Sequence, residues 1–237
     1  MSGLHAHVML PQHVRPSLGS MSEDAAGHAL VRVWLPDRPG ALGLVASRIG
    51  SVGGDIVGID VLERGSDVAV DEFAVILPTL DLVELLVREI EQVDGASVEE
   101  VRIVDTFPDP RIDALESAAV LCECSSVKDL HETLLEHTRR EFLADWTALV
   151  KCGEVISTSG EAHPPSDLLA ALAAGTTASP RVADGTTGPE DLAVAMLPNH
   201  EATLLVGRAG HPLRRRERTQ LLALARIADR AWILLAD

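Results

Sequence analysis

The stretch from Val31 to Leu62 constrains the fold of this chain more than any other. It opens within an alternating strand, Leu30–Leu35, which stops at the turn Pro36-Asp37-Arg38-Pro39-Gly40, because proline fixes φ and glycine permits a positive φ. Apolar residues then recur at helical spacing over Ala41–Val52. After two glycines, strand-like alternation returns over Asp55–Glu63. The stretch therefore predicts a strand, a tight turn, a helix and a second strand.

Three further segments extend this pattern into a complete small domain. Val68–Leu77 alternates like a strand, Leu82–Val93 carries a helical apolar stripe, and Ala96–Asp105 reads as a last strand. The resulting order, β-α-β-β-α-β, is the ferredoxin-like arrangement. With Asp-Arg-Pro-Gly between the first strand and the first helix, it resembles an ACT domain, the small regulatory module that binds amino acids in many metabolic proteins. We therefore expect an ACT-like domain over residues 28–107.

The second half, residues 111–237, follows a connector with two prolines, Pro108 and Pro110, which favour an extended backbone. Its apolar patterns predict helices and short strands, with Ala119–Cys124 either a strand or a continuation of the helix before it. The predicted segments are helices at Arg111–Ala118, Val127–Phe142, Leu168–Ala174 and Arg214–Leu235, and strands at Trp146–Lys151, Asp191–Leu197 and Thr203–Gly207. Residues 152–188 otherwise read largely as loop.

The end of this half, LLVGRAGHPLRRRERTQLLALARIADRAW, consists of a core strand, a glycine-containing turn and a long Leu/Ala helix. In that order it resembles the end of a GAF domain, and a generic α/β domain is the alternative. The fold class we expect is therefore α+β, with an N-terminal ferredoxin-like ACT domain followed by a second, GAF-like α/β domain.

Charge and cysteine content restrict the classes of function. The formal net charge is −16, which argues against general binding to nucleic acid or to an anionic membrane. No apolar run reaches the roughly 18 residues of a membrane span. Three cysteines form no even disulfide framework, and residues 1–27 lack the apolar core of a secretory signal. We expect a cytoplasmic protein with reduced thiols, and a disordered extension over residues 1–27.

The turn after the first strand is the best candidate site. It would present free backbone N–H groups at a helix N-terminus, where the helix dipole favours an anion such as an α-carboxylate. The resemblance implies a ligand held between this turn and the start of the second strand of a partner subunit. Carried over to this chain, it implicates Asp37, Arg38, Gly40, Ala41 and Leu42, with Asp55 and Ile56 from the neighbour. The alternative is a turn that only holds the fold.

Other constellations favour structural roles. Cys122-x-Cys124 lacks the two to four intervening residues that zinc sites prefer, so buried apolar cysteines are expected. His131 and His137 are six positions apart and face different ways on a helix, so they are no metalloprotease pair. The basic run Arg214–Arg218 reads as a solvated helix start. We expect no catalytic residues, no metal and no cofactor.

Three functions compete at this point. We favour a non-enzymatic sensor that binds an amino acid at an ACT dimer interface, and hence a homodimer. The alternative is a ligand-free interaction module or regulatory subunit of a separate metabolic enzyme. A hydrolase or transferase using His163, His200 or His211 is the third, and it lacks a recognisable nucleophile or base partner.

Overall fold

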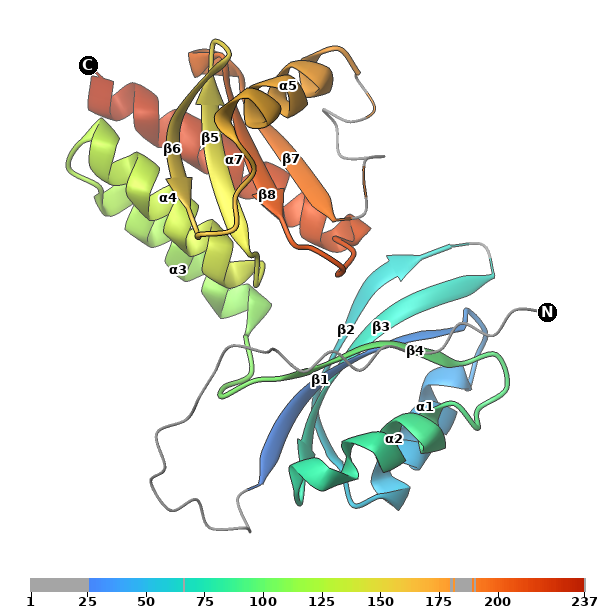
Figure 1. Cartoon of the computed structure of the whole chain (residues 1–237). Coiled ribbons are helices and arrows are strands. Elements are labelled where there is room, and N and C mark those ends of the chain that lie inside the picture. Colours follow the sequence, from blue (N-terminus) through green and yellow to red (C-terminus); the bar gives the residue numbers. More distant parts are fainter. Residues whose placement is uncertain (1–25, 66, 180, 182–188, 190, 237) are drawn as a thin grey trace. The chain divides into compact units, whose positions relative to one another are not determined.

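The computed structural model describes residues 26–65, 67–179, 181, 189 and 191–236, and the chain divides into two compact units between Phe107 and Pro108. The predicted extension lies outside the described residues except for Ala26 and Gly27, and Gly27 already belongs to the first strand. The predicted α+β class is confirmed, since each unit contains one antiparallel four-stranded sheet with helices packed on it (Figure 1).

The first unit is a sheet with two helices on one face (Figure 1). Its elements are β1 (Gly27–Pro36), α1 (Ala41–Ser51), β2 (Asp55–Arg64), β3 (Val68–Leu77), η1 (Leu80–Leu82), α2 (Val83–Ile90) and β4 (Ser97–Ile103). The strands are ordered β2-β3-β1-β4, which leaves β2 and β4 as the edges. Val31, Val33 and Leu35 alternate onto the helix-covered face and pack against Val45 and Ile49 of α1, because strand alternation and helical spacing direct both sets inward.

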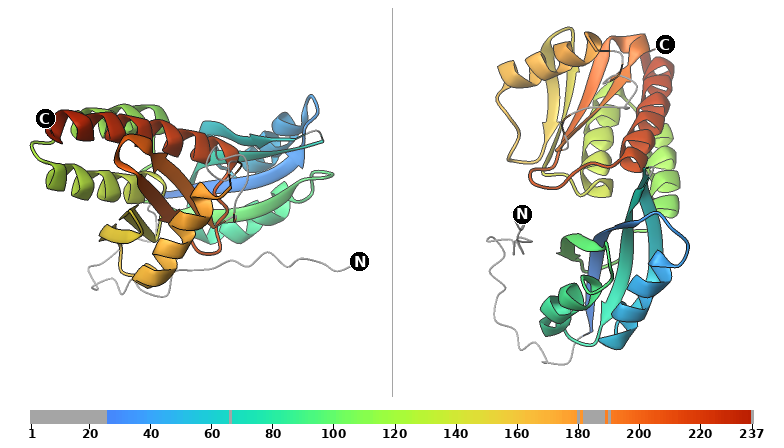
Figure 2. Two further views of the ribbon diagram at one scale, coloured as in Figure 1. Left: turned by 90° about the horizontal axis from the view of Figure 1, so that it is seen from above. Right: turned by 90° about the vertical axis from the view of Figure 1, so that its right-hand side faces the viewer.

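The second unit has helices on both faces of its sheet (Figures 1 and 2). Its elements are α3 (Pro110–Glu123), α4 (Val127–Glu141), β5 (Trp146–Lys151), β6 (Glu154–Ser159), α5 (Ser166–Thr177), β7 (Leu192–Leu197), η2 (Pro198–His200), β8 (Ala202–Gly207) and α7 (Arg215–Ala236). The strands are ordered β6-β5-β8-β7. One core lies between the sheet and α3, α4 and α7, and a smaller one lies between the opposite face and α5.

Two predictions about this unit are wrong. The segment read largely as loop contains a strand, β6, and α5 is longer than the helix predicted at Leu168–Ala174. Cys152 and Gly153 both have positive φ, so β5 and β6 are joined by a two-residue hairpin turn. Residues 119–123 continue α3 instead of forming a strand.

Candidate functional site

The turn between β1 and α1 is exposed and its helix start is uncapped. Gly40, the N-cap residue of α1, has φ 90° and contributes no side chain, and the first turn of the helix holds no acidic residue. A Cβ built on Gly40 would meet no atom within 4 Å. Among the described residues, no acceptor is found for the backbone N–H groups of Leu42 and Gly43. This turn therefore presents two free donors and the positive end of the α1 dipole to solvent.

Asp37 anchors the turn instead of capping the helix. Its N–H donates to the carbonyl of Asp67 at 3.0 Å, and its carboxylate accepts a hydrogen bond from Arg64 at 2.9 Å. Arg38 is exposed, and its N–H donates to the Pro36 carbonyl at 2.8 Å. The side chain of Ala41 is buried in the core, so only its backbone borders the turn. The structure thus brings the five predicted turn residues to one place, with Asp37 already paired.

Asp55 and Ile56 lie at the other end of the sheet in the same chain. Asp55 pairs with Ile76 across to β3, whereas Arg64, at the turn end of β2, pairs with Ala69. The strand between them has 10 residues at about 3.3 Å each, a separation of roughly 30 Å. Asp55 is exposed, and Ile56 packs against the core. Within one chain these two residues do not reach the turn, so only a neighbouring copy could supply them.

Asp71 is a site residue that the sequence reasoning missed. It lies on β3, on the same face as Phe73 and Val75, and its side chain is buried at 4% exposure. Its Oδ1 atom has no hydrogen-bond partner. Burial raises the pKa of the Asp71 carboxyl, Arg64 opposes that rise, and the nearby Asp37 carboxylate adds to it. An acidic residue at an otherwise apolar position of a strand was the sequence signal for it.

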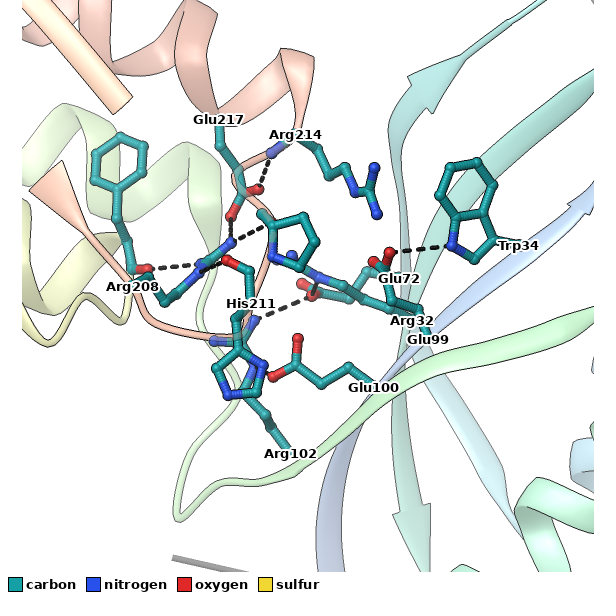
Figure 3. A network of polar contacts seen from close by, with 12 residues as sticks. Arg32, Trp34, Glu72, Glu99, Glu100, Arg102, Arg208, His211, Arg214 and Glu217 are labelled. Atoms are coloured by element: carbon teal, nitrogen blue, oxygen red, sulfur yellow. Dashed lines mark hydrogen bonds and ion pairs between the residues drawn. The ribbon is translucent and has the colours of Figure 1, made fainter. Parts of the chain in front are cut away.

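The face of the first sheet opposite its helices carries a separate, internally paired polar network (Figure 3). Arg32 donates to Glu72 at 2.6 Å, Arg102 pairs with both Glu72 and Glu100, and the Trp34 indole donates to a carboxylate of β4. Arg32 is 2% exposed. A buried guanidinium matched by carboxylates in this way is a structural pairing, so we assign it no ligand.

In the second unit, Arg208 organises the loop between β8 and α7 (Figure 3). Its guanidinium donates to the carbonyls of Phe142 at 2.7 Å and Pro212 at 2.8 Å, and pairs with Glu217 at 2.9 Å. These contacts satisfy a buried charge and tie the start of α7 to the end of α4. The basic run Arg214–Arg218, which was predicted to be a solvated helix start, therefore follows closely on the buried Arg208. The prediction is wrong for Arg214, whose side chain is also buried.

Of the three histidines considered for catalysis, His200 is paired with a carboxylate inside the second unit. Its Nδ1 lies 2.9 Å from Asp229, and its ring stacks on Trp232 with centroids 4.1 Å apart. His131 meets the same indole edge-on at 4.2 Å, and its buried Nε2 has no partner. Burial lowers the pKa of His131, and the charges of Lys151 and His200 lower it further.

The cysteines are not buried as predicted. Cys122 and Cys152 are exposed, Cys124 is half-buried, and all three thiols are free. Cys122 lies on the exposed side of α3 and Cys152 in the β5–β6 turn, whereas the expectation rested on the usual burial of free cysteines. Across the described residues, no group of three or more His, Cys, Asp or Glu could hold a metal ion. Nor does any described helix have the length and apolarity to cross a membrane.

Comparison with known proteins gives likenesses to solved structures and no match by sequence. No family model and no curated protein matches the chain. Among the solved structures that resemble it are an isolated ACT domain and the regulatory subunit of an enzyme. The ACT domain from GTP pyrophosphokinase of Chlorobium tepidum is 16% identical, with 34% of this chain and 100% of that chain covered and a TM-score of 0.28. The regulatory subunit of aspartate kinase from Thermus thermophilus, in its ligand-free form, is 15% identical, with 42% and 77% covered and a TM-score of 0.29.

Proposed function

We propose that this protein is a non-enzymatic regulatory module that binds an amino acid at the β1–α1 turn, between two copies of the chain. The observation that carries the proposal is the pairing of an uncapped helix start with a buried, unsatisfied carboxylate near the same turn. The free N–H groups of Leu42 and Gly43 suit an α-carboxylate, and Asp71 with Asp37 suits an α-ammonium.

The β2 edge supports a twofold-related partner. In the described sheet, strand β2 lies at the edge and pairs with β3 on one side, so its other side is open to a further strand. If two β2 strands pair antiparallel about their common centre, Asp55 of one copy lies opposite Arg64 of the other. That register would bring Asp55 of the neighbour to the β1–α1 turn. Exposed Val57, Ile59 and Val61 on β2 add apolar surface that such pairing would cover.

Thermal unfolding of the full chain against the twenty amino acids tests this function. A ligand at 100 times its dissociation constant stabilises a protein that binds it only when folded by about 2.7 kcal/mol. We expect one amino acid, or a small related group, to raise the unfolding temperature. No shift with any of them would remove the amino-acid proposal and favour the ligand-free interaction module.

A matched pair of glycine variants locates the effect. Gly40 and Gly153 have φ of 90° and 80°, and a Cβ on either would meet nothing within 4 Å. Gly40→Ala and Gly153→Ala should therefore cost similar backbone strain. Only Gly40→Ala places a methyl group in front of the free N–H groups, so it alone should abolish the ligand-induced shift. An equal loss in both variants would exclude the β1–α1 turn as the site.

A further inference from the structure

The three most exposed large apolar side chains of the described residues all belong to the second unit. Leu115 is 70% exposed, Leu234 65% and Ile112 57%, and no other large apolar residue reaches these fractions. The first and last of these three lie on α3 and Leu234 lies on α7, two helices that pack side by side. The two on α3 are three positions apart and so lie on one side of that helix, where an exposed apolar stripe is a candidate contact surface.

The spacing on α3 is that of a helix–helix seam. Ile112, Leu115, Ala119 and Cys122 follow one another in steps of three, four and three, and all four are exposed. This is the a/d pattern by which one helix packs against another along its length. The opposite side of α3 is already occupied, since Ser117 and Leu121 are buried in the unit. The exposed seam on α3 is therefore available for a second helix.

Helices α3 and α7 run in the same direction beneath this face. Ser117 and Gln220 both hydrogen-bond to the carboxylate of Glu141, so they stand at one level. Further along, Leu121 and Cys122 of α3 line a common groove with α7 residues that run from Ala223 to Leu235. Charges on α7 and α3 can therefore be compared by their height along the helices.

Opposite charges border the two sides of the seam. On the α7 side, Arg226 and Arg230 line the groove. On the other side, Glu116 and Glu123 each follow a seam residue by one position, which turns them by about 100° toward the side from which Ser117 bonds to Glu141 of α4. All four side chains are exposed, and none has an ion pair or hydrogen bond within the part of the chain that the structure describes. The face thus carries an acidic border, an apolar seam and a basic border.

We propose that this α3–α7 face joins two copies of the chain about a twofold axis parallel to α3. A twofold contact places the same patch on both copies. An axis along α3 sets the acidic border of one copy against the basic border of the other, whereas an axis across α3 would set arginine against arginine. The two α3 helices then run parallel and in register, so Leu115 meets its counterpart and Cys122 meets its counterpart in the second copy.

Cross-linking through Cys122 tests this contact in the full chain. With Cys124→Ser and Cys152→Ser, Cys122 is the single thiol, and a short bismaleimide should convert most of the protein to a covalent dimer at micromolar concentration. With Cys122→Ser and Cys124→Ser, the exposed Cys152 of the β5–β6 turn remains and should not cross-link. Adding Leu115→Glu to the Cys122 protein should reduce cross-linking at least tenfold, because it places two carboxylates against each other near the axis in place of two leucines.

A charge exchange tests the orientation of the two copies. Glu123→Arg should weaken dimerisation about threefold to fivefold in sedimentation equilibrium, the range for an exposed ion pair. Combining it with Arg226→Glu should restore the wild-type constant. No dimer from the Cys122 protein at any concentration would overturn the proposal, as would full cross-linking in the Leu115→Glu variant. The rate at which a maleimide alkylates Cys122 is a further check. If the thiol reacts slowly and dilution of the protein does not speed the reaction, a bound small molecule covers it instead of a second copy, and this would also overturn the proposal.

This contact does not depend on the amino-acid site, because its residues all belong to the second unit. The cross-link reports on α3 whether or not the β2 edges pair. A protein that cross-links through Cys122 and ignores every amino acid would lose the proposed function and keep the α3–α7 contact. A protein that responds to an amino acid and does not cross-link through Cys122 would keep the proposed function and lose the α3–α7 contact.

Discussion

Arg208 and Asp71 are both almost fully buried, but only Arg208 has hydrogen-bond or ion-pair partners for its whole charged group. The Arg208 guanidinium has carbonyl and carboxylate partners on three sides, which is how buried charges are held in stable folds. Asp71 leaves one carboxylate oxygen without a partner. An unsatisfied buried acceptor costs about 1–3 kcal/mol, so a site that uses Asp71 for binding gives a reason for its presence.

Asp71→Asn should alter how stability depends on pH. Because the pKa of Asp71 is raised in the folded protein, its contribution to stability is complete below the unfolded value of 3.8 and is lost as the pH rises through the folded pKa. The asparagine variant lacks this loss. Its free energy of unfolding, compared with wild type by urea denaturation, should therefore improve as the pH rises above 3.8 and level off above the folded pKa of Asp71.

A difference between the two proteins that stays constant over this range would show that Asp71 titrates normally. The same variant also tests the site, since it should lose the amino-acid response if the carboxylate holds the α-ammonium. Asp94→Asn, at an exposed aspartate in the turn between α2 and β4, provides the control for a lost carboxylate.

At this scale the sequence predicts backbone features better than side-chain environments. Proline and glycine located the β1–α1 turn because they act through their own φ angles, whatever the rest of the chain does. Asp71 was missed because its isolation depends on which groups of other elements surround it. The Asp37–Arg64 pair was missed for the same reason, since it joins residues at the ends of two different strands.

Helices α1 and α4 begin in opposite ways. Ser126 caps α4 by accepting a hydrogen bond from the Asp129 N–H at 3.2 Å, and the Asp129 carboxylate accepts one from the Ser125 N–H at 2.9 Å. Helix α1 has no such cap. A capped start satisfies its own donors, whereas an uncapped one leaves them for solvent or a ligand. The contrast is one reason to place binding at α1.

Trp232 joins three elements of the second unit, because His131 of α4 and His200 of η2 both contact its ring. The charged groups around His131 are Lys151 and His200, and Asp229 pairs with His200. With its pKa lowered, neutral His131 contributes stability that is complete above the unfolded value of 6.5 and is lost as the pH falls through the folded pKa.

His131→Phe should remove this loss while keeping the edge-on contact with Trp232. Compared with wild type, its free energy of unfolding should rise as the pH is lowered from 7.5 to 5, as measured by urea denaturation. His163→Phe, at an exposed histidine outside the cluster, should follow the wild-type curve. If His131→Phe also ran parallel to wild type, the histidine would not be losing charge on burial.

Element prediction succeeded where an apolar pattern was strong and failed at an edge. Val68–Leu77 and Trp146–Lys151 were predicted with the bounds that β3 and β5 have. Strand β6 was missed because it is an edge strand rich in Ser and Thr, and its hairpin turn uses Cys152 where asparagine or glycine is usual. For Ala119–Cys124 the sequence left a strand and a continued helix open, because a short apolar run fits either, and the structure shows the helix to Glu123.

Each of the two units has hydrophobic cores of its own. The core under α1 and α2 contains residues of the first unit, and the two cores around the β5–β8 sheet contain residues of the second. No core cluster of the described residues draws from both units. Core substitutions should therefore act on one unit at a time, since mutations without shared partners add.

Ile49→Ala and Leu149→Ala test this independence, because each side chain is fully buried in the core of a different unit. Each should lower the free energy of unfolding of its own unit by about 2–5 kcal/mol through lost burial and the cavity left behind. In calorimetry, the double variant should show the sum of the two effects within about 0.5 kcal/mol. An active amino acid should stabilise only the unit affected by Ile49→Ala, since Asp71 and the β1–α1 turn belong to it. A ligand that raised the transition lowered by Leu149→Ala would place its site in the second unit instead.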